Sequence, residues 1–442
     1  MLPVRFQPLK LSWVIVTLAA LLWLTAVASA QLTDSIIEPG HPAIGYPGEA
    51  NDAVARLNRK LQSGEARLEF EEGTGYLKGL LAALDIPIES QVAVFSGTSL
   101  QARIINARNP RTIFFNDSTA VGWMAGGLIE VASLDPKQGA NFYLLPQQTT
   151  PPLRQLARDT RCLACHYSTA TLGVPGFLVR SIPSAPSGMI MPWLGNYTTD
   201  HRSPLDERWG GWYVTGRGGR HLGNAPIADR TLRDVQINES NLNLTTLADR
   251  FDARSYLSPH SDIVALLVFD HQMRMMNLLT RLGWEARILE HDEGTTSPSL
   301  TDVATEVVDY MLFVDEAPLD GITGTSGFAE RFGALGPRDS KGRSLRDLDL
   351  QRRLFRYPCS YMIYSEAFDT LPEAARTAVY TRLLHVLTGK DTSSKYQKLT
   401  SPDRQAILEI LRETKKDLAL SRTDLQRRKG EGTLERWIPR TE

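Results

Sequence analysis

The spacing of apolar and polar positions divides the chain into a strand-rich half and a helical half. Between positions 91 and 145, short runs rich in Val, Ile and Phe alternate with turn clusters, which is typical of an antiparallel meander. The runs are Gln91–Phe95, Arg111–Phe115, Ala120–Trp123, Leu128–Ala132 and Asn141–Leu145. From position 260 apolar residues recur at helical spacing, and start and stop signals bound the predicted helices. They are His260–Gly283, Thr301–Phe313, Pro372–Leu387 and Ser401–Ala419.

Two shorter helices are expected before the strands, and a long loop region after them. Residues 53–61 follow Asn51 and Asp52, which are suitable capping residues, and residues 76–84 end close to a proline. Residues 171–225 are dense in Gly, Pro and Trp. Loops of this length are usually functional or disordered, and the aromatic content argues against disorder. The pattern therefore predicts an α+β fold with an N-terminal β-rich meander, a loop-rich middle and a C-terminal helical part.

The first 30 residues have the pattern of a secretory signal peptide. Arg5 and Lys10 provide positive charge, residues 11–27 are apolar, and Ala28-Ser29-Ala30 is a small-residue cleavage site. We expect a periplasmic or otherwise exported protein that begins at Gln31 and has no integral membrane span after cleavage. The alternative is an uncleaved anchor, because an apolar stretch of this length could barely span a bilayer.

Composition narrows the function mainly by exclusion. Apolar residues make up 42% of the chain and charged residues 22%, as in a globular protein, and the formal net charge is −1. This balance does not indicate a partner among nucleic acids. The chain contains only 3 cysteines, and two of them lie three residues apart.

Those two cysteines belong to the stretch Cys162-Leu163-Ala164-Cys165-His166. Cys-x-x-Cys-His is the attachment site of haem c: the thiols add to the two vinyl groups, and the histidine becomes the proximal ligand of the iron. A thioredoxin-like site would need a βαβ context, and a structural zinc site would need four ligands. The motif therefore predicts one covalent haem on Cys162 and Cys165, with His166 on the iron. The remaining cysteine, Cys359, is expected to be a buried and inert thiol.

The second axial ligand of such a haem is open, and a vacant sixth position is a further possibility. His271 lies in the apolar stripe of the helix predicted from residue 260, which favours a buried, neutral imidazole. A core histidine that is hydrogen-bonded within the protein would have the same pattern. His221 and His201 lie in the loop-rich middle and are further distal candidates. Met189 and Met191 are also possible ligands, or they fill gaps in packing.

The segment Glu207–His221 is unusual in composition. Its aromatic side chains could cover a haem, and its arginines could pair with the haem propionates. The alternative is a tight connector with buried tryptophans. The aromatic residues are Trp209, Trp212 and Tyr213, and the arginines are Arg208, Arg217 and Arg220.

Several stretches resemble a family of exported bacterial proteins with one c-type haem motif, a cytochrome-like family of unassigned function. They include Phe95–Gln101, Cys162–His166, Gly173–Gly176, Glu207–Gly216, Gly342–Asp347 and Tyr357–Ser360. The resemblance implies a periplasmic monohaem protein whose haem residues are Cys162, Cys165 and His166, and it implies no substrate. Taken with the patterning, it suggests a signal peptide over 1–30, a β-rich region over 31–150 and a haem-binding region over 151–255. A helical region over 256–420 and a charged tail over 421–442 would follow.

The function predicted from these features is electron transfer by an exported c-type cytochrome with a redox partner protein. One alternative is a haem enzyme, peroxidase-like or activating a small ligand, with an open iron site. Its argument is size, because a minimal haem carrier needs a much shorter chain. The other alternative is a partner-binding module in which the haem is structural. One haem without an identified distal group fits all three functions.

Overall fold

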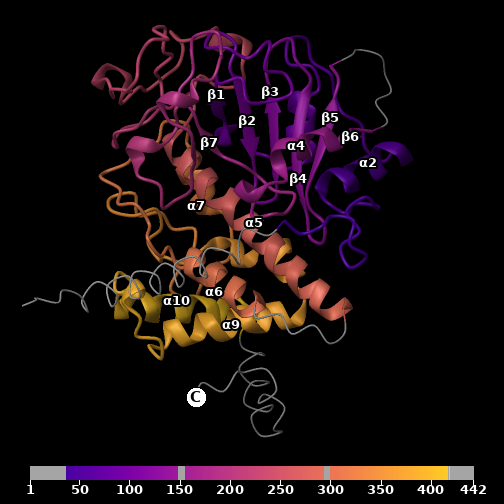
Figure 1. Ribbon diagram of the computed structural model, residues 1–442, viewed down its shortest axis with the longest axis vertical. Coiled ribbons are helices and arrows are strands. Elements are labelled where there is room, and N and C mark those ends of the chain that lie inside the picture. Colours follow the sequence, from indigo (N-terminus) through magenta and orange to yellow (C-terminus); the bar gives the residue numbers. More distant parts are fainter. Residues whose placement is uncertain (1–35, 148–154, 293–298, 417, 419–442) are drawn as a thin grey trace, which may run out of the picture.

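The computed structural model describes residues 36–147, 155–292, 299–416 and 418. A β-sheet lies at one end of the molecule, and a group of helices lies at the other (Figure 1). The long helix α5 (Ile263–His291) runs from the sheet toward those helices. The predicted α+β class is thus confirmed. The predicted signal peptide and the tail over 421–442 lie outside the described residues.

The sheet has seven antiparallel strands in the order β6-β5-β4-β3-β2-β1-β9. Strands β1 to β5 follow one another in the chain and each pairs with the next, so the predicted meander is confirmed. They are β1 (Val92–Val94), β2 (Arg111–Phe115), β3 (Thr119–Trp123), β4 (Ile129–Asp135) and β5 (Gly139–Leu145). The edges are β6 (Ala157–Arg158) and β9 (Trp212–Tyr213). A separate pair is formed by β7 (Arg180–Ser181) and β8 (Tyr197–Thr198).

The two faces of the sheet belong to two different apolar clusters, because successive side chains of a strand point to opposite sides. One face contributes Phe114, Val121 and Tyr143 to a cluster with α2 (Ala53–Ser63) and α3 (Leu77–Ala83). The other face contributes Ile113, Phe115, Ala120 and Phe142 to the main core, which α5 also enters. The main core includes residues from Val92 to Leu418, so it connects the regions that the sequence separates.

Helix α5 is longer than predicted at its C-terminal end and shorter at its start. Asp262 caps it by accepting hydrogen bonds from the N–H groups of Val264 and Ala265 at 2.8 and 3.3 Å, so helix α5 begins at residue 263 and not 260. Gly283 was expected to end the helix, but the helix continues to His291. A Cβ atom at position 283 would lie 3.3 Å from Leu371 Cδ2, so this glycine allows close packing and is not a stop signal.

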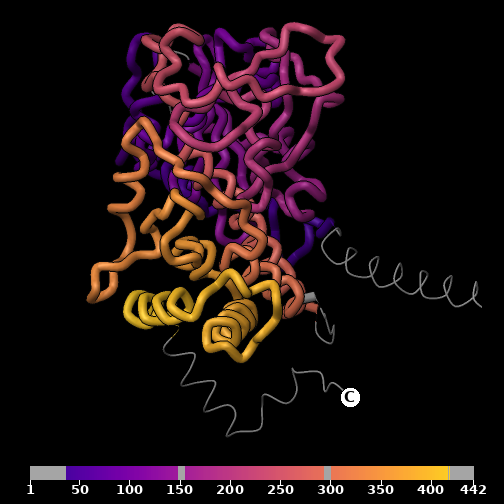
Figure 2. The backbone as a smooth tube through the Cα atoms, turned by 90° about the vertical axis from the view of Figure 1, so that its left-hand side faces the viewer, coloured from indigo at the N-terminus to yellow at the C-terminus, as the bar shows by residue number. Residues whose placement is uncertain are grey.

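The helices that follow α5 are α6 (Ser299–Met311), α7 (Phe328–Ala334), α8 (Glu366–Asp369), α9 (Glu373–Leu387) and α10 (Ser401–Thr414). Helices α6, α9 and α10 lie together at the end opposite the sheet, as Figures 1 and 2 both show for α9 and α10, whereas α7 packs beside the sheet, with 5.6 Å between the ring centroids of Phe328 and Phe115. Three of them match predicted helices, although α10 ends five residues before the expected Ala419. In the parts of the chain that the structure describes, no helix has the length and apolar character needed to cross a membrane.

Candidate haem-attachment site

The Cys-x-x-Cys-His stretch forms two successive helical turns directly after the edge strand β6. A 3-10 turn covers Thr160–Cys162, and a short α-helix, α4, covers Leu163–His166. Asp159 caps the first turn by accepting a hydrogen bond from the Arg161 N–H at 2.8 Å. Cys162 and Cys165 are three positions apart, a spacing that places them on the same side of a helical turn. Both are free thiols, Cys162 partly buried and Cys165 exposed. The two thiols can therefore meet one flat ligand.

The imidazole of His166 is oriented by a backbone carbonyl. Its Nδ1 lies 3.0 Å from the carbonyl oxygen of Gly176, and its ring lies 4.9 Å from the ring of Phe142 on β5. Since a carbonyl only accepts, Nδ1 carries the proton and Nε2 keeps its lone pair. Burial lowers the pKa of His166, which favours the neutral ring. Among the described residues, Nε2 makes no hydrogen bond. This is the tautomer that a metal-binding histidine needs.

The loop that supplies this carbonyl is itself fixed by helix α5. The Asn277 side chain accepts a hydrogen bond from the Phe177 N–H and donates one to the Phe177 carbonyl, each at 2.7 Å. A Cβ atom at Gly176 would come within 2.4 Å of Asn277 Oδ1, so only glycine fits there. Gly176 N–H in turn donates to the His166 carbonyl at 2.9 Å. The Gly173–Gly176 stretch, singled out in the sequence, thus positions the His166 ring.

A sheet face with small residues lies next to the motif. Ala132 pairs with Phe142 across β4 and β5, and it pairs with Ala120 across β3 and β4. Both Ala132 and Cys162 are partly buried and pack against the main core. Two residues after Ala120 on β3, Gly122 lies between the side chains of Arg111 and Glu130. These form an ion pair, with 2.8 Å between Nη1 and Oε2. This face therefore combines small residues with a charged pair beside the motif.

The protonation of the thiols follows their surroundings. Burial, with smaller effects from Asp159 and Glu130, raises the pKa of Cys162 to about 11, so this thiol is protonated at neutral pH. Cys359 is fully buried, and burial raises its pKa to about 12. The prediction of a buried thiol at Cys359 is therefore confirmed, and its neutral form explains why it would be inert.

His271 is buried as predicted, but both of its ring nitrogens already have partners. Nδ1 lies 2.8 Å from Nδ1 of His201, and Nε2 lies 2.8 Å from the hydroxyl of Ser360. The ring also stacks on Phe313, with 4.4 Å between the centroids. These contacts match the alternative of a hydrogen-bonded core histidine. Iron ligation by His271 would first require one of the two hydrogen bonds to break, so the geometry does not favour it.

If a haem is attached at the motif, we expect His271→Met to leave its spectrum unchanged while the substitution destabilises the fold. Burial lowers the pKa of His271 to about 3, below the ordinary value of 6.5, so the folded chain binds fewer protons than the unfolded chain between these values. Wild-type stability therefore falls, relative to the variant, by up to about 1.4 kcal/mol per pH unit as the pH decreases from 6.5 toward 3. Chemical denaturation of both proteins at several pH values measures this. A changed spectrum would instead assign His271 to the iron.

The other distal candidates lie in different surroundings, and none of them is directed to the motif by a contact of the described structure. Nδ1 of His221 accepts a hydrogen bond from the Gly223 N–H at 3.1 Å, its ring packs edge-on against Trp209, and burial lowers its pKa to about 4. His201 has its Nδ1 on His271, while its Nε2 is buried without a partner. Met191 is fully buried in a small apolar cluster, and Met189 is exposed at the surface. Within the described structure, none of these residues forms a hydrogen bond or ring contact with the Cys162–His166 turn.

The Glu207–His221 segment connects the sheet to α5 and does not offer its aromatic rings or its buried arginine to a ligand. Arg208 and Asp270 form a buried ion pair of 3.4 Å, and Trp209 Nε1 donates to the same carboxylate at 3.1 Å. Burial raises the pKa of Asp270 to about 6. Arg220 pairs with Glu239 at the surface. The alternative of a connector with buried tryptophans fits these contacts, and propionate binding by Arg208 would require breaking the buried pair.

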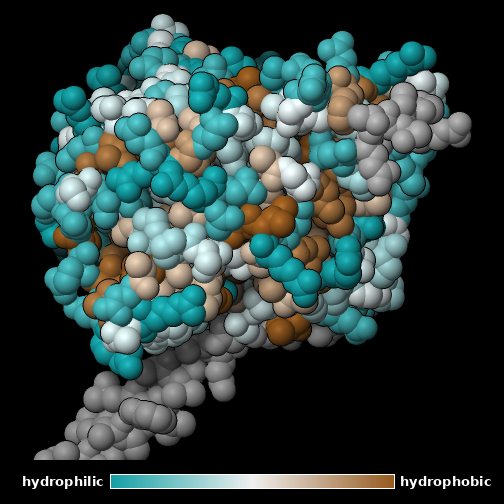
Figure 3. Space-filling model, turned by 90° about the horizontal axis from the view of Figure 1, so that it is seen from above, coloured by the Kyte–Doolittle hydropathy of each residue, from teal (hydrophilic) through white to brown (hydrophobic). Residues whose placement is uncertain are grey.

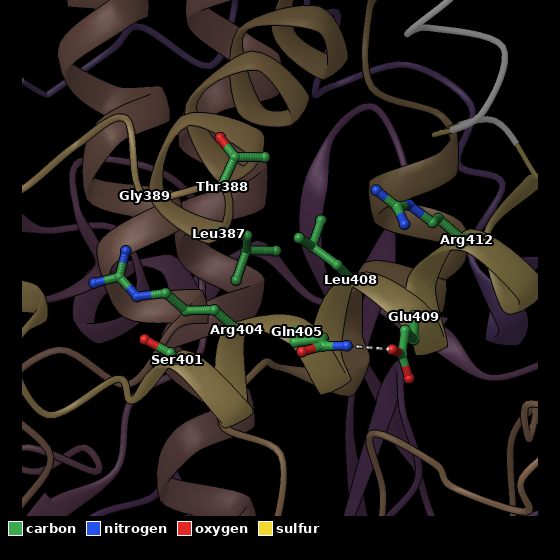
Figure 4. A pocket seen from close by; sticks show the side chains of 9 residues that line it. All are labelled: Leu387, Thr388, Gly389, Ser401, Arg404, Gln405, Leu408, Glu409 and Arg412. Atoms are coloured by element: carbon green, nitrogen blue, oxygen red, sulfur yellow. Dashed lines mark hydrogen bonds between the residues drawn. The ribbon is translucent and has the colours of Figure 1, made fainter.

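Two further surface features are separate from the motif. His41, His291 and Asp292 place their ligand atoms within 4.8 Å of one another, but Nδ1 of His41 accepts from the Ala43 N–H at 3.2 Å. This puts the ring proton of His41 on Nε2, which faces Asp292, so the group is built as a hydrogen-bonded cluster. A shallow pocket between α9 and α10 is lined by Arg404, Arg412 and seven other residues (Figure 4). Arg404 there donates to the Val386 carbonyl and therefore caps α9.

The surface seen from above in Figure 3 is mixed, with apolar patches interrupted by hydrophilic side chains. The large apolar side chains exposed on the described part of the protein are scattered along the chain. They are Ile36, Phe70, Ile88, Leu100, Ile104, Met189, Trp193, Leu232 and Leu335.

Comparison of the chain with known proteins found no matching family model and no match among curated proteins or solved structures. The resemblance to exported monohaem proteins stays a prediction. The argument for function therefore depends on the site itself.

Proposed function

We propose that this protein is an exported c-type cytochrome that carries one haem on Cys162 and Cys165, with His166 as the proximal ligand of the iron. The observation that carries the proposal is the 3.0 Å contact between His166 Nδ1 and the Gly176 carbonyl. It leaves Nε2 as the free nitrogen, on the same helical turn as two unpaired thiols. When bound, the haem supplies an iron that cycles between the ferric and ferrous states, which suits electron transfer.

This chain's own residues would hold and orient the haem. The thiols would form thioether bonds to the two vinyl groups, while the Gly176 carbonyl keeps the His166 ring in one orientation and increases its basicity. Phe142 packs against the same ring and limits its rotation. Asn277 fixes the loop behind it from the rigid helix α5. This support reaches from a central helix to the ligand atom, so the position of the imidazole should change little between oxidation states.

Small-ligand binding or catalysis at the iron is a second candidate function. The observation that favours it is that His271, His201 and His221 each have a ring nitrogen hydrogen-bonded within the protein, and that Met191 packs in a small apolar cluster. A haem with no protein ligand in its sixth position is open to small molecules. The two functions differ in this one property of the iron.

Absorption spectra of the purified mature protein test the proposal and separate the two functions. The protein should be produced in the periplasm together with a haem-maturation system. We expect colour that survives denaturing electrophoresis and acid extraction. Low-spin bands that do not change with carbon monoxide would support electron transfer, and a large shift would support the open site. Colour that is fully extracted from the wild-type chain would reject covalent haem and with it the proposal.

A further inference from the structure

An ion pair lies on the sheet face beside the Cys-x-x-Cys-His turn. Arg111 on β2 and Glu130 on β4 join across β3, with 2.8 Å between Nη1 and Oε2, and both side chains are 17% exposed. Gly122 lies between them, and a Cβ atom there would be 3.4 Å from Arg111 Cδ. The glycine therefore lets the arginine lie flat over β3. The neighbouring positions on this face, Ile113, Ala120 and Phe142, are apolar members of the core.

Glu130 is held from its other side by Gln101. The Gln101 amide donates to Glu130 Oε1 at 3.2 Å and to the Leu128 carbonyl at 3.1 Å, and it accepts from the Leu128 N–H at 2.8 Å. Because Gln101 is bound at both of its ends, the carboxylate has a fixed place, and so has the guanidinium that pairs with it. Gln101 ends the Phe95–Gln101 stretch that the sequence singled out, which no other part of the site explains.

One nitrogen of the Arg111 side chain makes no hydrogen bond to the described part of the chain. Its Nε is buried and has no hydrogen-bond partner within the described structure. A buried donor without an acceptor costs about 1–3 kcal/mol, so this nitrogen is available to donate to a bound carboxylate. The pair is also close to the motif. Glu130 precedes Ala132 by two residues on β4, and Ala132 pairs with Phe142, whose ring lies 4.9 Å from the ring of His166.

We propose that Arg111 binds a propionate of the haem and that Glu130 and Gln101 position it for this role. The inference rests on the proposed covalent haem. A haem brings two carboxylates on the edge opposite its vinyl groups, and a guanidinium is the side chain best suited to bind a carboxylate through two parallel hydrogen bonds. Arg111 thus takes the place of Arg208 and Arg220, whose side chains pair with Asp270 and Glu239, as the expected partner of the propionates.

Reversible binding of two porphyrins tests this directly. The full mature chain with Cys162→Ser and Cys165→Ser would serve as the parent, because haem then binds without thioether bonds. The probes are ferric protoporphyrin IX and its dimethyl ester, which differ only in the two carboxylates. We expect the parent to bind the free acid about 10-fold more tightly than the ester, or better, as for a hydrogen bond to a charged group.

Three single substitutions in this parent should affect the preference for the free acid in three different ways. Arg111→Met should remove the preference for the free acid. Glu130→Gln should increase it, since a competing carboxylate disappears while the arginine stays. Arg220→Met is the matched control, an arginine paired at the surface, and should leave the preference unchanged. If Arg111→Met does not fold, Arg111→Lys keeps the charge without the fork and should give an intermediate preference.

A preference that persists in Arg111→Met, or its absence in the parent, would overturn the role of Arg111. The same holds if Glu130→Gln lowers the preference as much as Arg111→Met does, because the pair would then be only a cross-strand contact. Failure of the proposed function looks different. In that case the wild-type chain acquires no covalent haem during maturation, and the parent binds neither porphyrin.

Discussion

Replacing both Cys162 and Cys165 by serine should abolish covalent haem while the protein remains folded. In the proposed attachment the two thiols supply both thioether bonds, and a hydroxyl does not add to the vinyl groups under the same conditions. Neither side chain is needed for the fold, because Cys165 is exposed and Cys162 is only partly buried. Haem staining of a denaturing gel measures the loss, and circular dichroism checks the fold.

Cys359→Ala is the matched control for this loss. Cys359 is fully buried and lies far along the chain in a turn after Pro358, so its removal should lower stability but leave the haem attached. Covalent haem that survives the double substitution would contradict the assignment of the thiols. Haem lost in Cys359→Ala while the fold is intact would contradict it as well.

His166→Ala separates attachment from ligation. The thiols stay in place, so thioether bonds can still form, but the iron loses its proximal imidazole and its spin state should change. The double serine variant and His166→Ala together thus distinguish the roles of the three motif residues.

The strands and helices could be predicted because their patterns are local. Alternating residues such as Phe114 and Phe115 face opposite clusters, as the period-2 pattern requires. The predicted helix ends were wrong where a contact between residues far apart in the sequence determines the structure. Gly283 has the chemistry of a helix end, but α5 continues past it, and Leu371 from the connection between α8 and α9 packs 3.3 Å from where a Cβ atom would lie. The capping residue of α5 is Asp262, since its carboxylate also serves a loop 63 residues away in the chain.

The candidate site, too, could be predicted only where its residues are close together in the sequence. Cys162, Cys165 and His166 are adjacent in sequence, so their spacing alone carried the prediction. The Gly176 carbonyl, Phe142 and the Arg111–Glu130 pair come from four separate segments, and only strand pairing and the α5 contact bring them together. The burial of His271 followed from its apolar stripe, but its partners His201 and Ser360 lie on other segments. A charged residue within an apolar strand, such as Arg111, was the one local signal that could have been noticed.

Asp262→Ala should be among the most destabilising single changes in this protein. The Asp262 carboxylate is fully buried and accepts five hydrogen bonds. Two come from the first turn of α5, and three come from Thr325 and Ser326 at 2.6–3.0 Å. Gly324 has no side chain where this carboxylate passes, since a Cβ atom there would lie 2.7 Å from its oxygens. The loop is thus shaped around Asp262.

The alanine variant leaves these donors without an acceptor, so we expect a loss of about 3–5 kcal/mol in the free energy of unfolding. Asp262→Ser should cost about 1 kcal/mol less, because a serine hydroxyl still caps the helix but does not reach the loop. Asp320→Ala, at an exposed position, is the control and should stay within about 0.5 kcal/mol of the wild type. Urea denaturation of the four proteins measures these differences. Equal stability of the serine variant and the wild type would show that the loop contacts contribute nothing to stability. The helix cap alone would then explain why Asp262 is buried at the start of α5, the helix that supports the candidate haem site.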